Sequence, residues 1–134
     1  MRALLLLLVL AGCPSSDTKT ECMLDSDCGG TAVCARDGEC LSASEVWSVK
    51  VSWTIRGSAA SGSTCASSPD FYLQFDSQIQ QDTFGYEPVP CEQGQFLVDK
   101  LPKRFIQVEI GENNRFLDAQ PINAAGSASF DLYP

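Results

Sequence analysis

The chain has 134 residues, with 9 Lys and Arg, 17 Asp and Glu, 7 Cys and no His. The absence of His excludes Ser-His-Asp and Cys-His catalysis and His-based zinc and haem sites. A net charge of −8 argues against a nucleic-acid-binding protein, which needs a basic face to neutralise phosphates. Hydrophobic residues make up 44% of the chain, so it contains a folded part, and its length suits one domain with a small appendage.

The first residues have the pattern of an export signal. Met1 and Arg2 form a short positive start, and residues 3–10 are nearly all Leu or Val. This run is too short to span a bilayer, which takes about 20 apolar residues, but it has the length of the apolar part of a signal peptide. We therefore predict that residues 1–12 are a signal peptide.

The signal ends in Leu10-Ala-Gly-Cys13, which resembles a bacterial lipobox. The resemblance implies that the mature protein begins at Cys13 and is held by membrane lipid through an acylated Cys13; an ordinary signal peptide with a coincidental Cys is the alternative. Pro14 is not the Asp that retains some lipoproteins in the inner membrane, which favours the outer membrane or the cell surface. Small polar residues continue to Thr20, so 13–20 is predicted to be a flexible tether.

The remaining cysteines are even in number, and an exported protein forms disulfides by default. Six cysteines allow fifteen pairings, which the spacing alone does not decide. The first four are separated by five residues each and lie in a predicted unit of residues 21–45 that is rich in Asp and Gly. So short a unit buries little apolar surface, so cross-links must order it. The expected disulfide residues are Cys22, Cys28, Cys34, Cys40, Cys65 and Cys91.

The unit 21–45 resembles small cysteine-rich knots of secreted eukaryotic proteins and the Cys-rich segments that follow the lipid anchor in exported myxobacterial proteins. The residues that carry the resemblance are Asp25-Ser-Asp-Cys-Gly-Gly, Val33-Cys and Asp37-Gly-Glu-Cys40. It suggests the interleaved pairs Cys22–Cys34 and Cys28–Cys40. A ring of this size contributes roughly 3 kcal/mol by restricting the unfolded chain.

Metal binding is the alternative use of this unit. Zinc prefers Cys pairs two to four residues apart, which the spacing does not supply. Calcium could use the oxygen ligands of Asp25, Asp27, Asp37 and Glu39, but Arg36 stands where an EF-hand would place its bidentate Glu. We therefore expect no metal or other cofactor, and solvated acids on a stapled loop.

Residues 46–134 are predicted to form an all-β domain. Apolar and polar residues alternate over 46–56, 71–75 and 106–110, with shorter strands at 96–98, 116–119 and 127–132. Gly/Ser-rich 57–68 reads as a loop, 85–90 as an edge strand broken by prolines, and 111–114 as a turn. The predicted core is Trp47, Val49, Val51, Trp53, Ile55, Phe71, Leu73, Phe75, Val98, Ile106, Val108, Ile110, Phe130 and Leu132.

These elements predict a six- to seven-stranded antiparallel β-sandwich preceded by the disulfide-stapled segment. Cys65 and Cys91 both lie in this domain, and separate folding units usually close their own bonds, so we favour the pair Cys65–Cys91. That bridge would add roughly 3.5 kcal/mol by the same mechanism.

One stretch resembles the carboxypeptidase-regulatory or transthyretin-like sandwich family. It runs from Cys91-Glu-Gln-Gly-Gln-Phe through Leu101-Pro102 to Phe105–Ile110. The family usually has a Gly two residues after the Leu and a Tyr opening the long strand, where this chain has Lys103 and Phe105. The resemblance implies a sandwich that is mostly a non-catalytic accessory.

Other side chains have a possible chemistry and a simpler structural role. Trp47 and Trp53 could stack on sugars but share the core-facing phase of one strand. Exposed aromatic contacts are better sought at Tyr72, Phe84 and Tyr86. Glycoside hydrolysis would need paired acids, for which the candidates are Asp70, Asp76 and Asp82. A basic cluster at Lys100, Lys103 and Arg104 could touch headgroups or an anionic glycan, or simply form a solvated turn.

The sequence thus predicts a lipid-anchored protein of the bacterial cell envelope without catalytic residues. Its expected role is to bind an envelope protein or a glycan, with no role in nucleic-acid binding. The alternatives are an envelope enzyme or enzyme subunit acting on polysaccharide, and a calcium-dependent adhesion module that uses the acids of residues 21–45.

Overall fold

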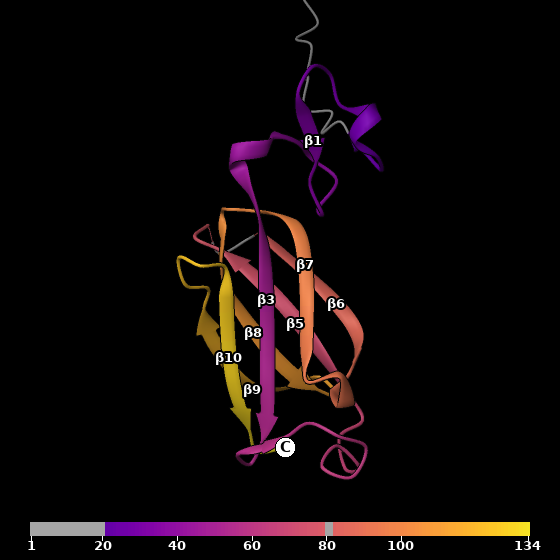
Figure 1. Cartoon of the computed structure of the whole chain (residues 1–134), viewed down its shortest axis with the longest axis vertical. Helices are drawn as coiled ribbons and strands as arrows, with labels where there is room; N and C mark the ends of the chain where they lie inside the picture. The colour runs from indigo at the N-terminus through magenta and orange to yellow at the C-terminus, as the bar shows by residue number, and fades with distance from the viewer. Residues whose placement is uncertain (1–20, 80–81) are drawn as a thin grey trace, which may run out of the picture.

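The computed structural model describes residues 21–79 and 82–134, and this part of the chain is all-β with no α-helix. A small Cys-rich unit stands at one end of a β-sandwich, and the C-terminus lies at the opposite end (Figure 1). The predicted fold class is confirmed. No helix within these ranges is long and apolar enough to cross a membrane. The predicted signal peptide, Cys13 and the tether lie outside the described residues.

The Cys-rich unit, called the knot below, is built from very short elements. A 3-10 turn η1 (Asp25–Asp27) precedes the hairpin of β1 (Ala32–Cys34) and β2 (Cys40–Ser42), and η2 (Ala43–Glu45) leads into the sandwich. Disulfides join Cys22 to Cys34 and Cys28 to Cys40, with Cα atoms 5.7 and 5.5 Å apart. This is the interleaved pairing that the resemblance suggested. The knot's buried cluster is made of the cysteines themselves, so the cross-links serve in place of an apolar core.

One sheet of the sandwich is centred on the longest strand, β3 (Val46–Ile55). One edge of β3 pairs with β10 (Ser127–Leu132); the other pairs with β7 (Gln95–Pro102) and, at its end, with the two-residue β4 (Ser58–Ala59). β10 runs parallel to β3, unlike the other pairs in the sandwich. The chain crosses between the sheets after β9 and enters this sheet at the end where β3 begins, which makes the two strands parallel (Figure 1).

The second sheet is antiparallel, in the order β6-β5-β8-β9. Its strands are β5 (Asp70–Ser77), β6 (Thr83–Pro90), β8 (Phe105–Glu112) and β9 (Arg115–Pro121). β6 lies at the edge, as its prolines predicted. Asn113 and Asn114 have positive φ of 46° and 60° and form the two-residue turn between β8 and β9.

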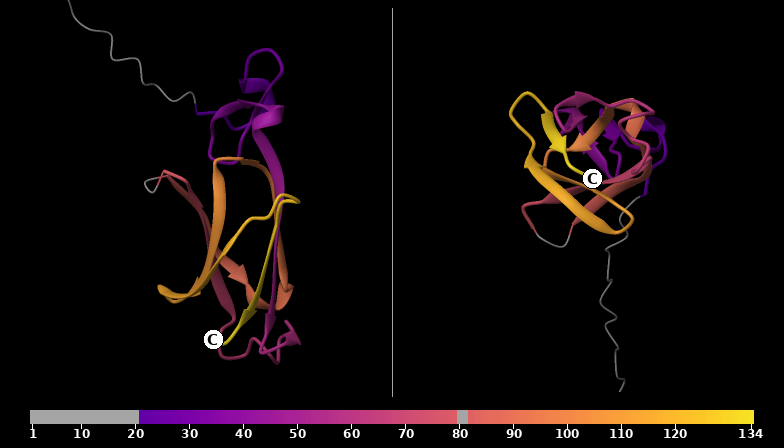
Figure 2. Two further views of the ribbon diagram at one scale, coloured as in Figure 1. Left: turned by 90° about the vertical axis from the view of Figure 1, so that its left-hand side faces the viewer. Right: turned by 90° about the horizontal axis from the view of Figure 1, so that it is seen from below.

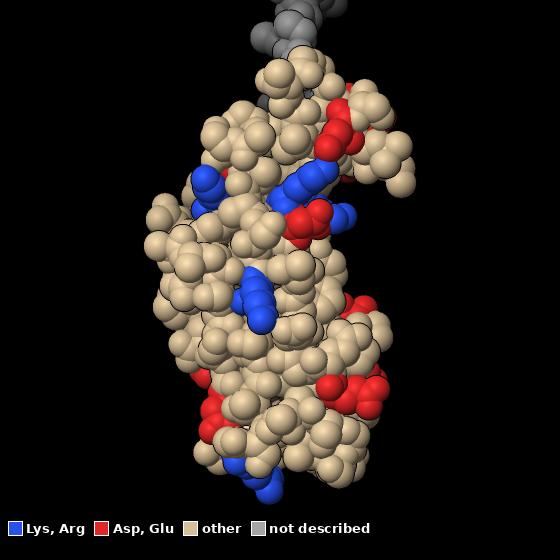
Figure 3. Space-filling view, in the orientation of Figure 1, with Lys and Arg blue, Asp and Glu red and all other residues tan. Residues whose placement is uncertain are grey.

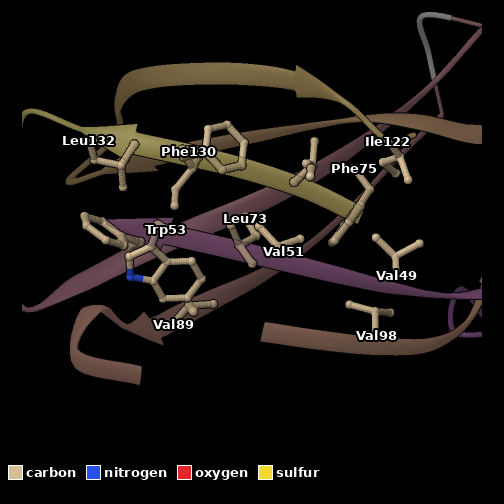
Figure 4. Packing of buried hydrophobic residues seen from close by; sticks show 14 of the residues in the cluster. Val49, Val51, Trp53, Leu73, Phe75, Val89, Val98, Ile122, Phe130 and Leu132 are labelled. Atoms are coloured by element: carbon tan, nitrogen blue, oxygen red, sulfur yellow. The ribbon is translucent and has the colours of Figure 1, made fainter. Parts of the chain in front are cut away.

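The two sheets stack as layers (Figure 2) and enclose one apolar core (Figure 4). Within it, the indole Nε1 of Trp53 donates a 2.7 Å hydrogen bond to the carbonyl oxygen of Cys91, and Cys91 is bonded to Cys65. The favoured pair is therefore present and lies inside the core. Twelve of the fourteen predicted core residues are buried. The core also includes Val89, Leu101, Phe105, Ile122 and Ala128.

Two predicted core residues lie elsewhere. Trp47 is half-buried at the rim of the core. Ile106 is 38% exposed. In the pairing of β5 with β8, Asp76 faces Gln107 and the next residue, Ser77, faces Phe105, so Ile106 is an extra residue without a partner on β5. A bulge of this kind shifts the alternation by one residue. Phe105 consequently occupies the core position that periodicity had assigned to Ile106.

Candidate functional site

The basic cluster and the acids of the knot are joined by ion pairs. Lys100 Nζ lies 2.7 Å from both carboxylate oxygens of Asp25. On the neighbouring turn, the guanidinium of Arg104 contacts the carboxylates of Asp37, Glu39 and Asp82. In Figure 3 blue and red side chains meet where the knot rests on the sandwich. The expectation of a solvated basic turn is therefore wrong for Lys100 and Arg104.

A bulge in β7 places these groups under the knot. Trp47 faces Leu101 and Val49 faces Val98, so β7 has one extra residue here, and Lys100 has a positive φ of 52°. The Lys100 carbonyl accepts a 3.0 Å hydrogen bond from the backbone N–H of Arg36. The guanidinium of Arg36 also binds the Asp99 carboxylate.

These contacts also shift the pKa values of the acids at the junction. The hydrogen bond from Lys100, together with one from the Cys34 amide, holds the pKa of Asp25 below its ordinary value. The hydrogen bond from Arg36 lowers the pKa of Asp99 in the same way. The junction is therefore stabilised by charge at neutral pH.

The four acids considered for calcium do not form one ligand set. Asp25 binds Lys100, and Asp27 accepts the backbone N–H groups of Met23 and Leu24 at 3.0 and 2.9 Å. Asp37 and Glu39 contact Arg104. The chain's own donors thus use the oxygens that calcium would need.

The sulfurs of Cys22, Cys28 and Cys40 lie within 4.8 Å of one another, a spacing that thiolates could use to hold a metal. All three sulfurs belong to disulfides. Since the thiolate is the metal-binding form of Cys, the oxidised knot does not offer this ligand set.

Neither tryptophan forms an exposed sugar platform. Trp53 is buried and makes an edge-to-face contact with Phe71, at 6.0 Å between ring centroids. Trp47 packs against the core from its rim, and its buried Nε1 has no hydrogen-bond partner within the described residues. The core interpretation holds for Trp53, and for Trp47 in part.

A cleft of about 470 Å³ lies on β5 and β6. Tyr72 and Gln74 of β5 alternate with buried Phe71, Leu73 and Phe75, so they point to the outer face of their sheet. The cleft is lined by Tyr72, Leu73, Gln74, Thr83, Phe84, Gly85, Tyr86, Glu87 and Asn114. We name this feature the outer-face cleft and take it as the candidate site.

Glycines stand opposite both outward-facing β5 residues of the cleft. Gly85 of β6 stands opposite Gln74, and Gly111 of β8 stands opposite Tyr72. A Cβ on Gly85 would lie 2.9 Å from the Leu73 carbonyl oxygen, and one on Gly111 would lie 2.3 Å from the Tyr72 ring. The close approaches require glycine at both positions. Gly85 leaves Gln74 without a neighbouring side chain on β6, whereas the Tyr72 ring occupies the space over Gly111.

The electrostatics of this face differ from those of the knot junction. Burial, together with the charges of Glu109 and Glu87, raises the pKa of Tyr72 above its ordinary value. Burial and the charge of Asp76 raise the pKa of Glu109. Acids therefore repel one another here, and no Lys or Arg lines the described cleft.

The structure brings together only part of the predicted chemistry. Of the three aromatic candidates, Tyr72 faces outward. Phe84 and Tyr86 are half-buried against the core, and their ring centroids lie 5.2 Å apart. Asp82 binds Arg104, while Asp76 accepts a 2.9 Å hydrogen bond from Gln74. Asp70 is exposed at the start of β5, at the other end of this strand from Asp76. Asp76 and Asp82 thus have separate partners, and the three acids do not form the catalytic pair considered above.

Sequence reasoning missed the residues that surround Tyr72. Gln74 shares its outward phase, so the alternation of β5 was the available signal. Glu87, Glu109 and Asn114 come from other strands and a turn. Their grouping depends on strand order and register, which the sequence does not specify.

Comparison with known proteins adds no relative: no family model, no curated protein and no solved structure matches the chain.

Proposed function

We propose that this protein is a lipid-anchored, non-catalytic binding module of the bacterial cell envelope, located at the outer membrane or cell surface. The observation that carries the proposal is the outer-face cleft, in which an aromatic ring lies among amide, hydroxyl and carboxylate groups. Ligand sites are commonly concave and combine apolar surface with a few polar groups. The bound partner is an envelope glycan or protein.

Two features support binding over catalysis. The chain has no His to act as general base. Of the acids considered for hydrolysis, Asp82 is engaged by Arg104 and Asp76 by Gln74. An enzyme that acts on polysaccharide is therefore the weaker interpretation.

We also propose that the sandwich is of the carboxypeptidase-regulatory or transthyretin-like type. In the structure, β7 ends in Leu101-Pro102, a tight turn at Lys103 and Arg104 follows, and β8 begins at Phe105. This strand-turn-strand order is the one on which the resemblance rests. Such sandwiches are mostly accessories, which agrees with a binding role.

The anchor is proposed to be lipid on Cys13, preceded by a signal peptide at 1–12 and followed by a tether at 13–20. Two or more acyl chains give stable membrane attachment, at about 0.8 kcal/mol for each buried CH₂. The described chain begins in the knot, at the end of the sandwich opposite the C-terminus (Figure 1). A tether there would attach the knot end of the molecule to the membrane.

Site-specific photo-cross-linking in intact cells tests the binding role. A photoreactive residue is placed at Gln74 in the cleft, or at exposed Ser129 on the outer face of the other sheet as the matched control. We expect a discrete adduct from position 74, with glycan or protein, and none from position 129. Adducts of equal yield from both positions, or none from position 74, would contradict a binding role for the cleft.

A further inference from the structure

We propose that the outer-face cleft binds an oligosaccharide that carries free amino groups. This inference rests on the proposed binding function and adds the chemical class of the ligand. Three properties of the cleft support it: a fixed aromatic ring, neutral hydrogen-bonding groups and an uncompensated negative charge.

The fixed ring is that of Tyr72. It lies directly over Gly111, since a Cβ there would be 2.3 and 2.4 Å from two ring atoms. A ring held in place loses little freedom on binding. Beyond Gly111, its partner Phe116 on β9 is 55% exposed and extends the apolar surface on the same face. Aromatic rings of this kind match the apolar C–H faces of pyranose rings.

The neutral polar groups are Gln74, Thr83 and Asn114, which line the cleft. Amide and hydroxyl groups both donate and accept hydrogen bonds, as sugar hydroxyls do. The Nε2 of Gln74 donates to Asp76 at 2.9 Å, which fixes the amide and leaves its carbonyl oxygen as an acceptor. The cleft therefore offers hydrogen-bonding partners for hydroxyl groups around an aromatic ring, and one of them, Gln74, is held in place.

Charge decides which sugars fit. Glu87 lines the cleft and Glu109 faces Gln74, and both act electrostatically on Tyr72. Elsewhere in the described chain many acids have a Lys or Arg partner, namely Asp25, Asp37, Glu39, Asp82, Asp99 and Glu112. Among the described residues, no Lys or Arg lines the cleft. An ammonium group on the ligand would supply the missing positive charge, whereas an anionic glycan would be repelled.

A basic peptide would also neutralise the negative charge of the cleft, but the strand pairing around the cleft favours a sugar. Peptides that bind sheets usually add to an edge strand through backbone hydrogen bonds. Both edges of β5, which runs through the cleft, are already paired with β6 and β8. The free edge of the sheet next to β5 is β6, which contains Pro88 and Pro90, and proline lacks the N–H group that an added strand would use. A sugar needs only a ring face and hydroxyl partners, which the outer surface of β5 supplies.

Calorimetric titration of the full chain, purified in a neutral detergent, tests this inference. The three probes are the hexasaccharide of glucosamine, its fully N-acetylated counterpart and hexalysine. We expect glucosamine hexasaccharide to bind about tenfold or more tightly than either of the others. Added salt should weaken its binding, because screening acts on exposed charges.

Substitutions separate the ring from the charges. Tyr72→Ala should weaken binding of the glucosamine hexasaccharide about fivefold or more, whereas Tyr72→Phe, which keeps the ring, should retain it within about twofold. The double change Glu87→Gln with Glu109→Gln should remove the preference over the N-acetylated sugar. Tyr133→Ala and Glu92→Gln, at exposed positions that do not line the cleft, are the matched controls.

Each contrary outcome has a distinct meaning. Equal binding of the N-acetylated sugar would overturn the charge argument, and binding of hexalysine as tight as that of the glucosamine sugar would replace the glycan with a basic peptide. If no probe binds, the inference is wrong. The proposed binding function is decided separately, by the cross-linking from position 74.

Discussion

At the scale of single residues, Gly111 shows how one position can shape a surface. It lies on the outer face of its sheet and yet is buried, because the Tyr72 ring covers it. The missing side chain at Gly111 makes room for the Tyr72 ring, which lines the cleft. A substitution at Gly111 is expected to change both the stability of the fold and the position of the Tyr72 ring.

We predict that Gly111→Ala destabilises the protein by about 2 kcal/mol or more, as expected for overpacking against a fixed surface. The new Cβ would stand 2.3 Å from the Tyr72 ring and 2.4 Å from the Arg115 carbonyl oxygen. Urea unfolding measures the change. Gly29→Ala is the matched control, because nothing lies within 4 Å of its Cβ position. Equal stability of the two variants would show that Tyr72 does not cover Gly111.

Glu109 gives a prediction with a definite pH dependence. Its pKa is raised in the fold by burial and by Asp76. The folded state thus holds the proton more tightly than the unfolded chain, so this group's stabilising effect is lost as pH rises above the ordinary pKa near 4.3. Glu109→Gln should therefore raise Tm at neutral pH relative to wild type, and the difference should shrink towards pH 4.

The pH dependence of Tm is measured in the same way for Glu92→Gln as a control, since Glu92 is exposed and does not line the cleft. A destabilised Glu109→Gln variant at neutral pH would mean that an unseen cation pairs with Glu109. That result would also weaken the charge argument for the ligand.

At the scale of elements, the chain's alternation predicted the faces of its strands well where pairing is regular. β3, β5 and β10 bury the residues that periodicity assigned, from Val49 to Ile55, from Phe71 to Phe75, and at Phe130 and Leu132. The errors fall where an extra residue interrupts pairing, at Ile106 and opposite Trp47. A bulge depends on both strands of a pair, so one strand's sequence does not reveal it.

The contrast between local patterns and contacts across strands also explains which features of the knot, its junction with the sandwich and the cleft could be predicted. The knot's disulfides followed from a motif, and Cys65–Cys91 from the division into units. The ion pairs that Lys100 and Arg104 make with the knot join residues more than sixty positions apart, so no local pattern contains them. The cleft was missed for that reason as well, apart from Tyr72.

Docking of the knot on the sandwich gives a third prediction. Arg104 contacts three carboxylates at the junction, so Arg104→Gln should release the knot partially. We expect the Arg36 amide, which donates to the Lys100 carbonyl, to exchange its hydrogen about tenfold faster. Hydrogen exchange with mass spectrometry measures this. Lys103→Gln, on the same turn, is the matched control.

Low pH should also weaken the docking of the knot on the sandwich. The pKa values of Asp25 and Asp99 are lowered by Lys100 and Arg36 respectively. A lowered carboxyl pKa stabilises the fold above the ordinary value near 3.9, and the effect is lost as pH falls through the folded pKa. Protection of the Arg36 amide, corrected for intrinsic exchange, should decline below about pH 4. Protection that is unchanged at acid pH and in Arg104→Gln would show that the ion pairs do not hold the knot.

At the scale of the whole molecule, the features lie in a definite order along the long axis. The knot stands at one end and the C-terminus at the other (Figure 1), with the sandwich and its outer-face cleft between them. The other large face, over β3, β7 and β10, is mostly uncharged in Figure 3. An anchor that precedes residue 21 would hold the knot end at the membrane and leave the sandwich, with its cleft, projecting from it.

The central claim is that this protein is a binding module held at a membrane through residue 13. Membrane fractionation of cells that express either the wild-type chain or the Cys13→Ser variant tests this claim most directly. We expect the wild type in the membrane fraction, with the mass of an acylated mature form that begins at Cys13, and the variant in the soluble fraction. Membrane retention of the variant, or a wild-type mass without lipid, would contradict the anchored-module account.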